Sequence, residues 1–436
     1  MLLVLAVFLT ACADVPNTQP LAVEELVRSD ERPVVSTGAQ VLVDTDFAAL
    51  RALAPRRPVR VGLVTNHTAT VTTADGGPSH LIDRLHAADD IELAALFGPE
   101  HGLRGTAEAG EMVDSGLDSN TGVRIWSLYG STRRPPAAAL LNLDVLVFDM
   151  QDVGARFYTY VSTMGYAMQA ASEAGLPFVV LDRPNPIGGN RMAGFLMESP
   201  YESFVGLYPV PQQHGLTAGE LARMIVGEGW LTGLANLPLH IVELQGWNRA
   251  MLFPETGIPF NPPSPNIPDF ETALVYAGMG LVEGVTASEG RGTRTPFVLV
   301  GAPWVDGEAL AASLNEAGLP GARFEGATFT PESIRGMASE PKHLGRRLGG
   351  VRVHVEDAAA YEPIRVALHV IAGMYRQAPT AERRSYFNRR WMAQLAGSDR
   401  LRTSIEAGMT PDAVTRLWER DMASFQYRRA AYLLYD

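Results

Sequence analysis

Short apolar runs alternate with amphipathic stretches from Val59 onward, and this alternation predicts an α/β fold. One helix is expected at residues 161–174, where Gly175 is well placed to end it. Another begins at Thr217, with Glu220 as its capping-box partner. Continuous apolar strands between helices are typical of a parallel sheet covered on both faces. The expected strands cover residues 59–64, 91–97, 123–128, 143–148, 178–181 and 240–244, and a first helix covers residues 81–88.

The segment from Pro259 to Pro268 breaks this alternation, because its prolines remove hydrogen-bond donors and restrict the residues before them. We place a domain boundary in this segment, between residues 39–262 and residues 263–436. The second part mixes strand-like runs with later helices, such as the one expected at residues 363–375. It is therefore predicted to be a smaller α+β domain, with strands at residues 297–300 and 351–355.

The chain begins with an apolar run, residues 2–9, that is too short to span a bilayer and has the length of a signal-peptide core. The segment Leu9-Thr10-Ala11-Cys12 resembles a bacterial lipobox, in which the cysteine is lipidated and becomes the mature N-terminus. We therefore predict a signal peptide over residues 1–12, lipidation of Cys12 and a tether over residues 13–38. The expected product is an exported cell-envelope lipoprotein in the periplasm, attached to the membrane through its lipid anchor only.

Composition narrows the classes of function. Apolar residues make up 46% of the chain and charged residues 19%, which is ordinary for a globular protein. The net charge of −12 argues against a nucleic-acid partner. Lys342 is the only lysine, which argues against chemistry that needs a catalytic amine. No G-x-G-x-x-G follows a predicted strand, and neither a Walker motif nor a G-x-S-x-G elbow occurs. We therefore expect no cofactor.

Polar side chains follow four of the predicted parallel strands. Ligands of open α/β sheets bind outside the carboxyl ends of the strands. The four clusters are therefore expected to converge on one cleft. They are Asn66-His67, Glu100-His101, Asp149 with Asp152, and Asp182-Arg183 with Asn185.

Six segments in order carry a resemblance to a known family. They are residues 62–68 (GLVTNHT), 97–105 (FGPEHGLRG), 151–160 (QDVGARFYTY), 181–186 (LDRPNP), 214–220 (HGLTAGE) and 288–293 (SEGRGT). Together they resemble the NamZ-type exo-β-N-acetylmuramidases, once grouped only as a domain of unknown function. The resemblance implies a Rossmann-like N-terminal domain and a smaller C-terminal domain. It also implies a glycoside hydrolase that removes terminal N-acetylmuramic acid from peptidoglycan-derived muropeptides or disaccharides.

Glycoside hydrolysis commonly uses two carboxyl groups, one of which protonates the leaving oxygen. Glu100 is our choice for the general acid/base, because it follows a buried strand in a loop shaped by glycine and proline. The second carboxylate is left open between Asp152, Asp149 and Glu289. Asp149 is equally suited to cap its own loop, and Glu289 to pair with Arg291. In a third possibility, the acetamido group of the substrate acts as the nucleophile.

The lactyl carboxylate of N-acetylmuramic acid calls for a cation, and arginine suits bidentate carboxylate recognition. Four arginines lie near motif centres, and at least one is expected to be a structural ion-pair residue. The remaining candidates for substrate binding are polar or aromatic residues of the same motifs. The arginines are Arg104, Arg156, Arg183 and Arg291, and the other candidates are Asn66, His67, His101, Asp149, Tyr158, Asn185 and His214.

Two alternative functions remain at this point. A metal-dependent hydrolase of cell-wall material would use His67, His101 and His214 with Glu100 or Asp152, which are ligand types suited to zinc. These histidines lie in three separate loops without H-E-x-x-H spacing, so we expect no metal. A non-catalytic peptidoglycan-binding lipoprotein would keep the polar groups that face the sugar but would not need Glu100.

Overall fold

The computed structural model describes residues 35–436, apart from residues 55, 74–75, 101–102, 104–115 and 131. Cys12, most of the predicted tether, His101 and Arg104 lie outside the described residues. Residues 35–38, predicted as the end of the tether, belong instead to the folded chain. Val35 is buried and its N–H donates to the carbonyl of Thr256 (3.0 Å), and Ser36 pairs with Gln245.

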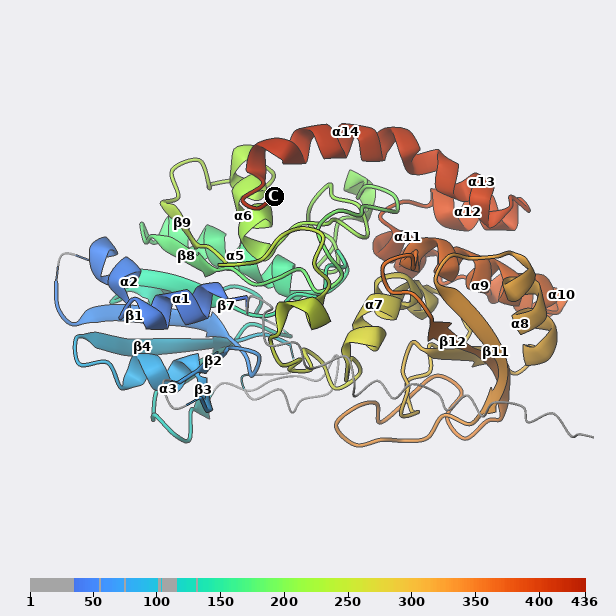
Figure 1. Ribbon diagram of the computed structural model, residues 1–436, viewed down its shortest axis with the longest axis horizontal. Coiled ribbons are helices and arrows are strands. Elements are labelled where there is room, and N and C mark those ends of the chain that lie inside the picture. Colours follow the sequence, from blue (N-terminus) through green and yellow to red (C-terminus); the bar gives the residue numbers. More distant parts are fainter. Residues whose placement is uncertain (1–34, 55, 74–75, 101–102, 104–115, 131) are drawn as a thin grey trace, which may run out of the picture. The chain divides into compact units, whose positions relative to one another are not determined.

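The central element is a seven-stranded sheet in the order β5-β6-β4-β1-β7-β8-β9. All neighbouring strands run parallel except β5, which is antiparallel to β6. The strands are β1 (Val59–Thr65), β4 (Ile91–Gly98), β5 (Gly116–Leu117), β6 (Arg124–Ser127), β7 (Val145–Asp149), β8 (Phe178–Leu181) and β9 (Leu239–Val242). The predicted strands and the parallel α/β sheet are confirmed (Figure 1).

Alternate strand residues face two separate hydrophobic cores, as the continuous apolar runs require. In β7, Val145 and Val147 pack into one core, whereas Leu146 and Phe148 pack into the other. The first core is covered by α1 (Gly38–Asp44), α2 (Ala48–Leu53) and α3 (Leu81–His86), and the second by α4 (Ala137–Leu140), α5 (Tyr160–Glu173) and α6 (Ala218–Gly227). A short hairpin of β2 (Thr70–Thr72) and β3 (Pro78–His80) lies outside the main sheet.

Local signals end and begin the helices as expected. Gly175 follows α5 with a φ of 69°, a backbone conformation that glycine adopts at low cost. At the start of α6, the Thr217 hydroxyl accepts the N–H of Glu220 (3.2 Å), and the Glu220 carboxylate accepts the N–H of Thr217 (3.0 Å). The predicted capping box is therefore confirmed.

The C-terminal part is smaller and is built around an antiparallel sheet in the order β10-β12-β11. Residues 259–268 form no helix or strand, as their prolines predict. The strands are β10 (Leu299–Ala302), β11 (Ala322–Phe329) and β12 (Leu348–Val355). The helices are α7 (Phe270–Met279), the 3₁₀ helix η4 (Gly280–Gly284), α8 (Gly307–Glu316), α9 (Pro363–Gln377), α10 (Thr380–Ser385), α11 (Arg389–Ala396), α12 (Arg400–Glu406) and α13 (Pro411–Thr415).

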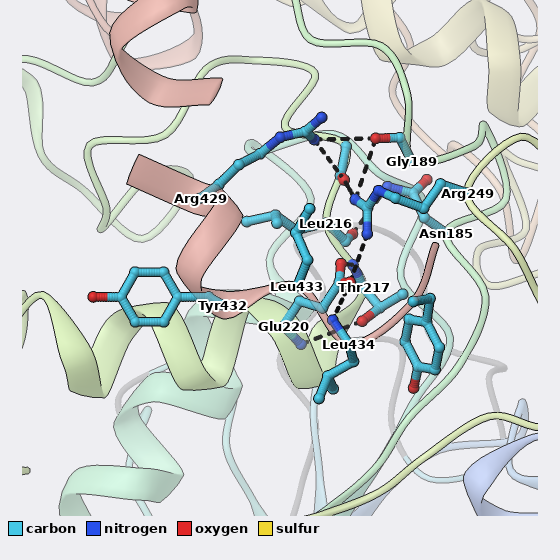
Figure 2. A network of polar contacts seen from close by, with 12 residues as sticks. Asn185, Gly189, Leu216, Thr217, Glu220, Arg249, Arg429, Tyr432, Leu433 and Leu434 are labelled. Atoms are coloured by element: carbon cyan, nitrogen blue, oxygen red, sulfur yellow. Dashed lines mark hydrogen bonds and ion pairs between the residues drawn. The ribbon is translucent and has the colours of Figure 1, made fainter. Parts of the chain in front are cut away.

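The last α-helix, α14 (Glu419–Arg429), leads the chain back to the N-terminal domain (Figure 1). The 3₁₀ helix η6 (Ala430–Tyr432) and the residues after it contact α6. Arg223 donates to the carbonyls of Tyr432 and Leu433. The N–H of Leu434 donates to Glu220 (3.0 Å) (Figure 2). The C-terminus is therefore held against the sheet domain by hydrogen bonds as well as packing.

Among the described residues, no helix has the length and apolar character that crossing a membrane requires.

Candidate active site

A cavity of about 660 Å³ lies beyond the carboxyl ends of β4, β6 and β7. Both domains line it, so it is an interdomain site. The sheet domain contributes Glu100, Tyr129, Arg133, Phe157, Tyr158, Thr159 and Phe204, and the C-terminal domain contributes, among others, Tyr276 of α7, Glu283 of η4, Arg291, Phe297 and Arg390 of α11.

Glu100 is half-buried in the wall of this cavity, directly after β4. Its Oε2 accepts a hydrogen bond from the Thr159 hydroxyl (2.9 Å). The Tyr129 hydroxyl also hydrogen-bonds to the Glu100 carboxylate. Burial raises the pKa of Tyr129 well above its usual value, and the negative charge of Glu100 raises it further. Two hydroxyl groups therefore orient one carboxylate at the cavity wall.

Arg291 faces the same cavity from the C-terminal domain, but its charge is already compensated. Its Nη2 donates to Glu283 (2.9 Å), and its Nε lies 3.6 Å from Glu289. Burial alone lowers the pKa of Arg291, but the charges of Glu283 and Glu289 outweigh this effect and raise it. Arg291 therefore belongs to an ion-pair network with Glu283 and Glu289 at the cavity wall.

Glu289, a candidate for the second carboxylate, is buried in that network and does not line the cavity. Its Oε2 lies 3.0 Å from Nζ of Lys342. The same ammonium donates to the backbone carbonyls of Val282 (3.0 Å) and Val285 (2.9 Å) at the end of η4. The position of Glu289 therefore indicates a structural role, because its charge compensates the only lysine of the chain.

Asp152 and His214 are brought together by the fold although they are far apart in sequence. His214 Nε2 lies 3.6 Å from Asp152 Oδ2, which also accepts the N–H of Gly154 (2.8 Å). The other oxygen, Asp152 Oδ1, is buried and has no hydrogen-bond partner among the described residues. The negative charge of Asp152 adds to burial in raising the pKa of Tyr276, a residue of the cavity wall. Like Glu289, Asp152 is not itself a lining residue of the cavity.

Asp149 and Arg183 form a buried bidentate ion pair, with distances of 2.5 and 3.0 Å. Neither residue lines the cavity, and each compensates the charge of the other in the protein interior. Arg156 is also fully buried, where it donates to the carbonyls of Phe195 (2.7 Å) and Leu395 (2.9 Å). Burial lowers the pKa of Arg156 to about 9. Arg183 is thus in a buried ion pair, the role expected for at least one of the four arginines, whereas Arg156 donates to backbone carbonyls.

The other polar candidates mainly hold loops in place. Asn66 Oδ1 accepts the N–H and hydroxyl of Thr68, and Asn185 Nδ2 donates to the carbonyl of Leu216 (3.0 Å). His67 Nε2 bonds to the carbonyl of Pro262 (2.6 Å). None of these three candidates lines the cavity.

Tyr158 does line the cavity, and its hydroxyl donates to the carbonyl of Pro263 (2.8 Å). Of the described candidates, the structure therefore places Glu100, Tyr158 and Arg291 at the cavity.

Sequence reasoning missed several cavity residues, including Tyr129, Arg133, Phe204 and Arg390. Tyr129 could have been found, because it follows the predicted strand at residues 123–128 and belongs to the same sheet edge. Arg133 and Phe204 lie in loops outside every recognised motif, and no spacing connects them to Glu100.

Metal ligation was the main alternative chemistry. Throughout the part of the chain that the structure describes, no group of three or more His, Cys, Asp or Glu side chains is arranged so that it could hold a metal ion. His101 lies outside this part.

Comparison with known proteins gives a consistent result. Residues 61–271 match the N-terminal domain, and residues 274–435 the C-terminal domain, of the family described as exo-beta-N-acetylmuramidase NamZ. The chain is 42% identical over 405 residues to the peptidoglycan beta-N-acetylmuramidase NamZ of Bacillus subtilis (strain 168), covering 93% of this chain and 92% of that protein.

Two solved structures of DUF1343 family proteins from Bacteroides fragilis NCTC 9343 are similar as well. One is 35% identical with a TM-score of 0.82, and covers 93% of this chain and 100% of its own. The other is 31% identical with a TM-score of 0.74, and the match covers 93% of this chain and 99% of that protein. The chain therefore belongs to the NamZ family of exo-β-N-acetylmuramidases, which are glycoside hydrolases.

Proposed function

We propose that the cavity around Glu100 is the active site in which this exo-β-N-acetylmuramidase releases terminal N-acetylmuramic acid from peptidoglycan fragments. The observation that supports this most directly is the half-buried Glu100 carboxylate, oriented by Thr159 and Tyr129 on the wall of an interdomain cavity. The cavity volume of about 660 Å³ lies within the usual range of about 300–1,000 Å³ for small-ligand sites.

In this proposal Glu100 protonates the glycosidic oxygen as the bond to the sugar breaks. A general acid has to lie within hydrogen-bond reach of the oxygen it protonates, in a fixed orientation. The Thr159 hydroxyl holds Glu100 Oε2, and Tyr129 adds a second contact, so the carboxyl group cannot rotate freely. Tyr158 and Tyr276 provide an aromatic surface on which a sugar ring can lie.

We propose Asp152 rather than Glu289 as the second acidic group. Asp152 Oδ1 is buried without a hydrogen-bond partner among the described residues, and a buried acceptor of this kind is costly unless a ligand or water completes it. Glu289 Oε2 also lacks a hydrogen-bond partner among the described residues, but both oxygens of Glu289 lie in ion pairs with cations, whereas Asp152 Oδ1 lies in none. An Asp152 carboxylate can serve either as the second carboxylate of the reaction or as the group that orients the acetamido group of the substrate.

The test uses the purified full-length chain with a chromogenic β-N-acetylmuramide and the matching β-N-acetylglucosaminide. Wild type, Glu100→Gln, Asp152→Asn and Glu289→Gln are compared, with Glu173→Gln as a control on the exposed surface. Loss of a general acid is expected to lower kcat by about 100- to 10,000-fold in Glu100→Gln. Asp152→Asn should also lose activity, whereas Glu289→Gln should mainly lower thermal stability.

Three results would contradict the proposal. They are no release by the wild type from either sugar, full activity of Glu100→Gln, and loss of wild-type activity on treatment with EDTA. The last result would favour the metal-dependent hydrolase instead.

We also propose that the chain is exported to the periplasm and anchored through a lipid on Cys12. The support is the lipobox-like segment at residues 9–12 after an apolar run. When the full-length chain is expressed in bacteria with labelled palmitate, label and membrane association are expected for the wild type. Both should be absent from Cys12→Ser. Equal labelling of the two chains would refute the anchor.

A further inference from the structure

Arg133 is a cation of the cavity wall whose charge is not compensated by any carboxylate of the described residues. It lies in the loop between β6 and α4 and is exposed. Its guanidinium carbon lies 4.5 Å from the centroid of the Phe204 ring. Unlike Arg291, it forms no ion pair with any described residue. An arginine in this state is available to bind an anion.

Among the described residues, Arg133 packs against the Phe204 ring and donates no hydrogen bond. Phe204 is itself packed, because it stacks on Tyr166 with ring centroids 6.1 Å apart and an angle of 2° between the planes. On another side its centroid lies 6.3 Å from that of Tyr129. A guanidinium group packed against an aromatic ring keeps the N–H groups at its edge free for a carboxylate.

Arg133 belongs to the same wall as the proposed general acid. Both Arg133 and Glu100 line the cavity, and Tyr129 connects them, because it contacts Phe204 and hydrogen-bonds to Glu100. The positive charge of Arg133 also acts on Tyr129, where it opposes the effect of Glu100 and lowers the pKa. A sugar that places its glycosidic oxygen at Glu100 therefore lies within reach of Arg133.

We propose that Arg133 binds the lactyl carboxylate of the terminal N-acetylmuramic acid and thereby determines the preference for muramides over glucosaminides. This inference rests on the proposed function of the cavity. The lactyl group is the chemical difference between the two sugars, and its carboxylate carries the only charge on the free sugar. Glu283 already pairs with Arg291, and Glu100 and Glu202 are further carboxylates of the lining, so an anionic substrate needs a cation that does not pair with one of these carboxylates.

Arg390 is the competing cation, since it lines the cavity from α11 and also forms no ion pair with a described residue. Unlike Arg133, it does not pack against an aromatic ring of the described residues. Its side chain is therefore less well positioned to discriminate between two sugars at Glu100.

The experiment compares Arg133→Met, Arg133→Lys and Arg390→Met with the wild type. Arg134→Met is the matched control, because Arg134 is the next residue in the loop but pairs with Glu173 on the surface, outside this cavity (2.6 Å). The substrates are the chromogenic β-N-acetylmuramide, its lactamide, in which a neutral amide replaces the carboxylate, and the β-N-acetylglucosaminide. The readout is kcat/KM for each substrate.

We expect the wild type and Arg134→Met to prefer the free acid over the lactamide by about 30-fold, which corresponds to about 2 kcal/mol. Arg133→Met should lose this preference by reacting more slowly with the free acid while its reaction with the lactamide is unchanged. Arg133→Lys should retain part of the preference, because the charge remains but the bidentate geometry is lost.

The proposal is overturned if Arg133→Met slows all three substrates equally, since that is the result of a structural role. It is also overturned if Arg390→Met, rather than Arg133→Met, abolishes the preference. A failure of the proposed function looks different, because the wild type would then release nothing from any substrate.

Discussion

The buried ion pair between Glu220 and Arg249 allows a quantitative test of how the C-terminus is held. Both side chains are buried, and Arg249 Nη1 donates to Glu220 Oε1 over 2.5 Å (Figure 2). The same oxygen accepts the N–H of Leu434 (3.0 Å), while Oε2 accepts the N–H of Thr217. The variant Glu220→Gln keeps the shape of this side chain but removes its charge.

The expected destabilisation follows from the uncompensated guanidinium group. Breaking a buried ion pair by removing one partner costs about 3–5 kcal/mol, because the remaining charge stays buried. Arg249 retains contacts to the carbonyls of Gly189 and Gly215, which cannot neutralise it. For a folded chain of about 400 residues, an unfolding entropy of about 2.1 cal/mol/K per residue gives about 0.8 kcal/mol per degree. The Tm of Glu220→Gln should therefore fall by about 4–6 °C.

The assay is thermal unfolding, followed by circular dichroism, of Glu220→Gln, Arg249→Met and the double variant. The double variant should lose clearly less stability than the sum of the two single variants, because it leaves no unpaired charge. The reasoning is refuted if the double variant equals that sum to within about 1 °C, or if Glu220→Gln lowers the Tm by less than about 1 °C.

Two further predictions concern a buried carboxyl group and a tightly packed glycine. Burial raises the pKa of Asp182 from 3.8 to about 6, although a hydrogen bond from the Tyr435 hydroxyl opposes this effect. Between these two pH values the folded chain therefore binds more protons than the unfolded chain. This contribution to stability is present at low pH and is lost as the pH rises through about 6. The free energy of unfolding of Asp182→Asn, relative to that of the wild type, should therefore rise by about 2 kcal/mol between pH 4 and pH 7, as measured by thermal unfolding. A difference between the two chains that does not change with pH would contradict this. A Cβ atom at Gly165 would collide with the hydroxyl of Tyr208, which is buried and donates to a backbone carbonyl. Gly165→Ala should therefore lower the free energy of unfolding by about 1–3 kcal/mol. An unchanged Tm would refute this packing argument.

The fold could largely be predicted from local patterns, because those patterns carry the physical cause of each element. Continuous apolar runs such as residues 145–148 have to be covered on both faces, which requires a parallel sheet between helices. Thr217 and Glu220 satisfy the first N–H groups of a helix wherever that helix lies. The prolines of residues 259–268 prevent regular structure regardless of their surroundings. These effects act over a few residues and depend little on the rest of the chain.

The composition of the site was decided by the tertiary structure. The sequence alone brought polar residues to one sheet edge, but it did not tell which of them would satisfy each other. Asp149 and Arg183 are separated by 34 residues and neutralise each other, so neither is free for substrate. Arg133 and Phe204 come from distant loops, and their contact exists only once the chain has folded. Charge compensation depends on which partners meet in space. For that reason the sequence determined the sheet and Glu100 at its edge, while the folded chain decided which arginines of the cavity wall pair with a described carboxylate and which do not.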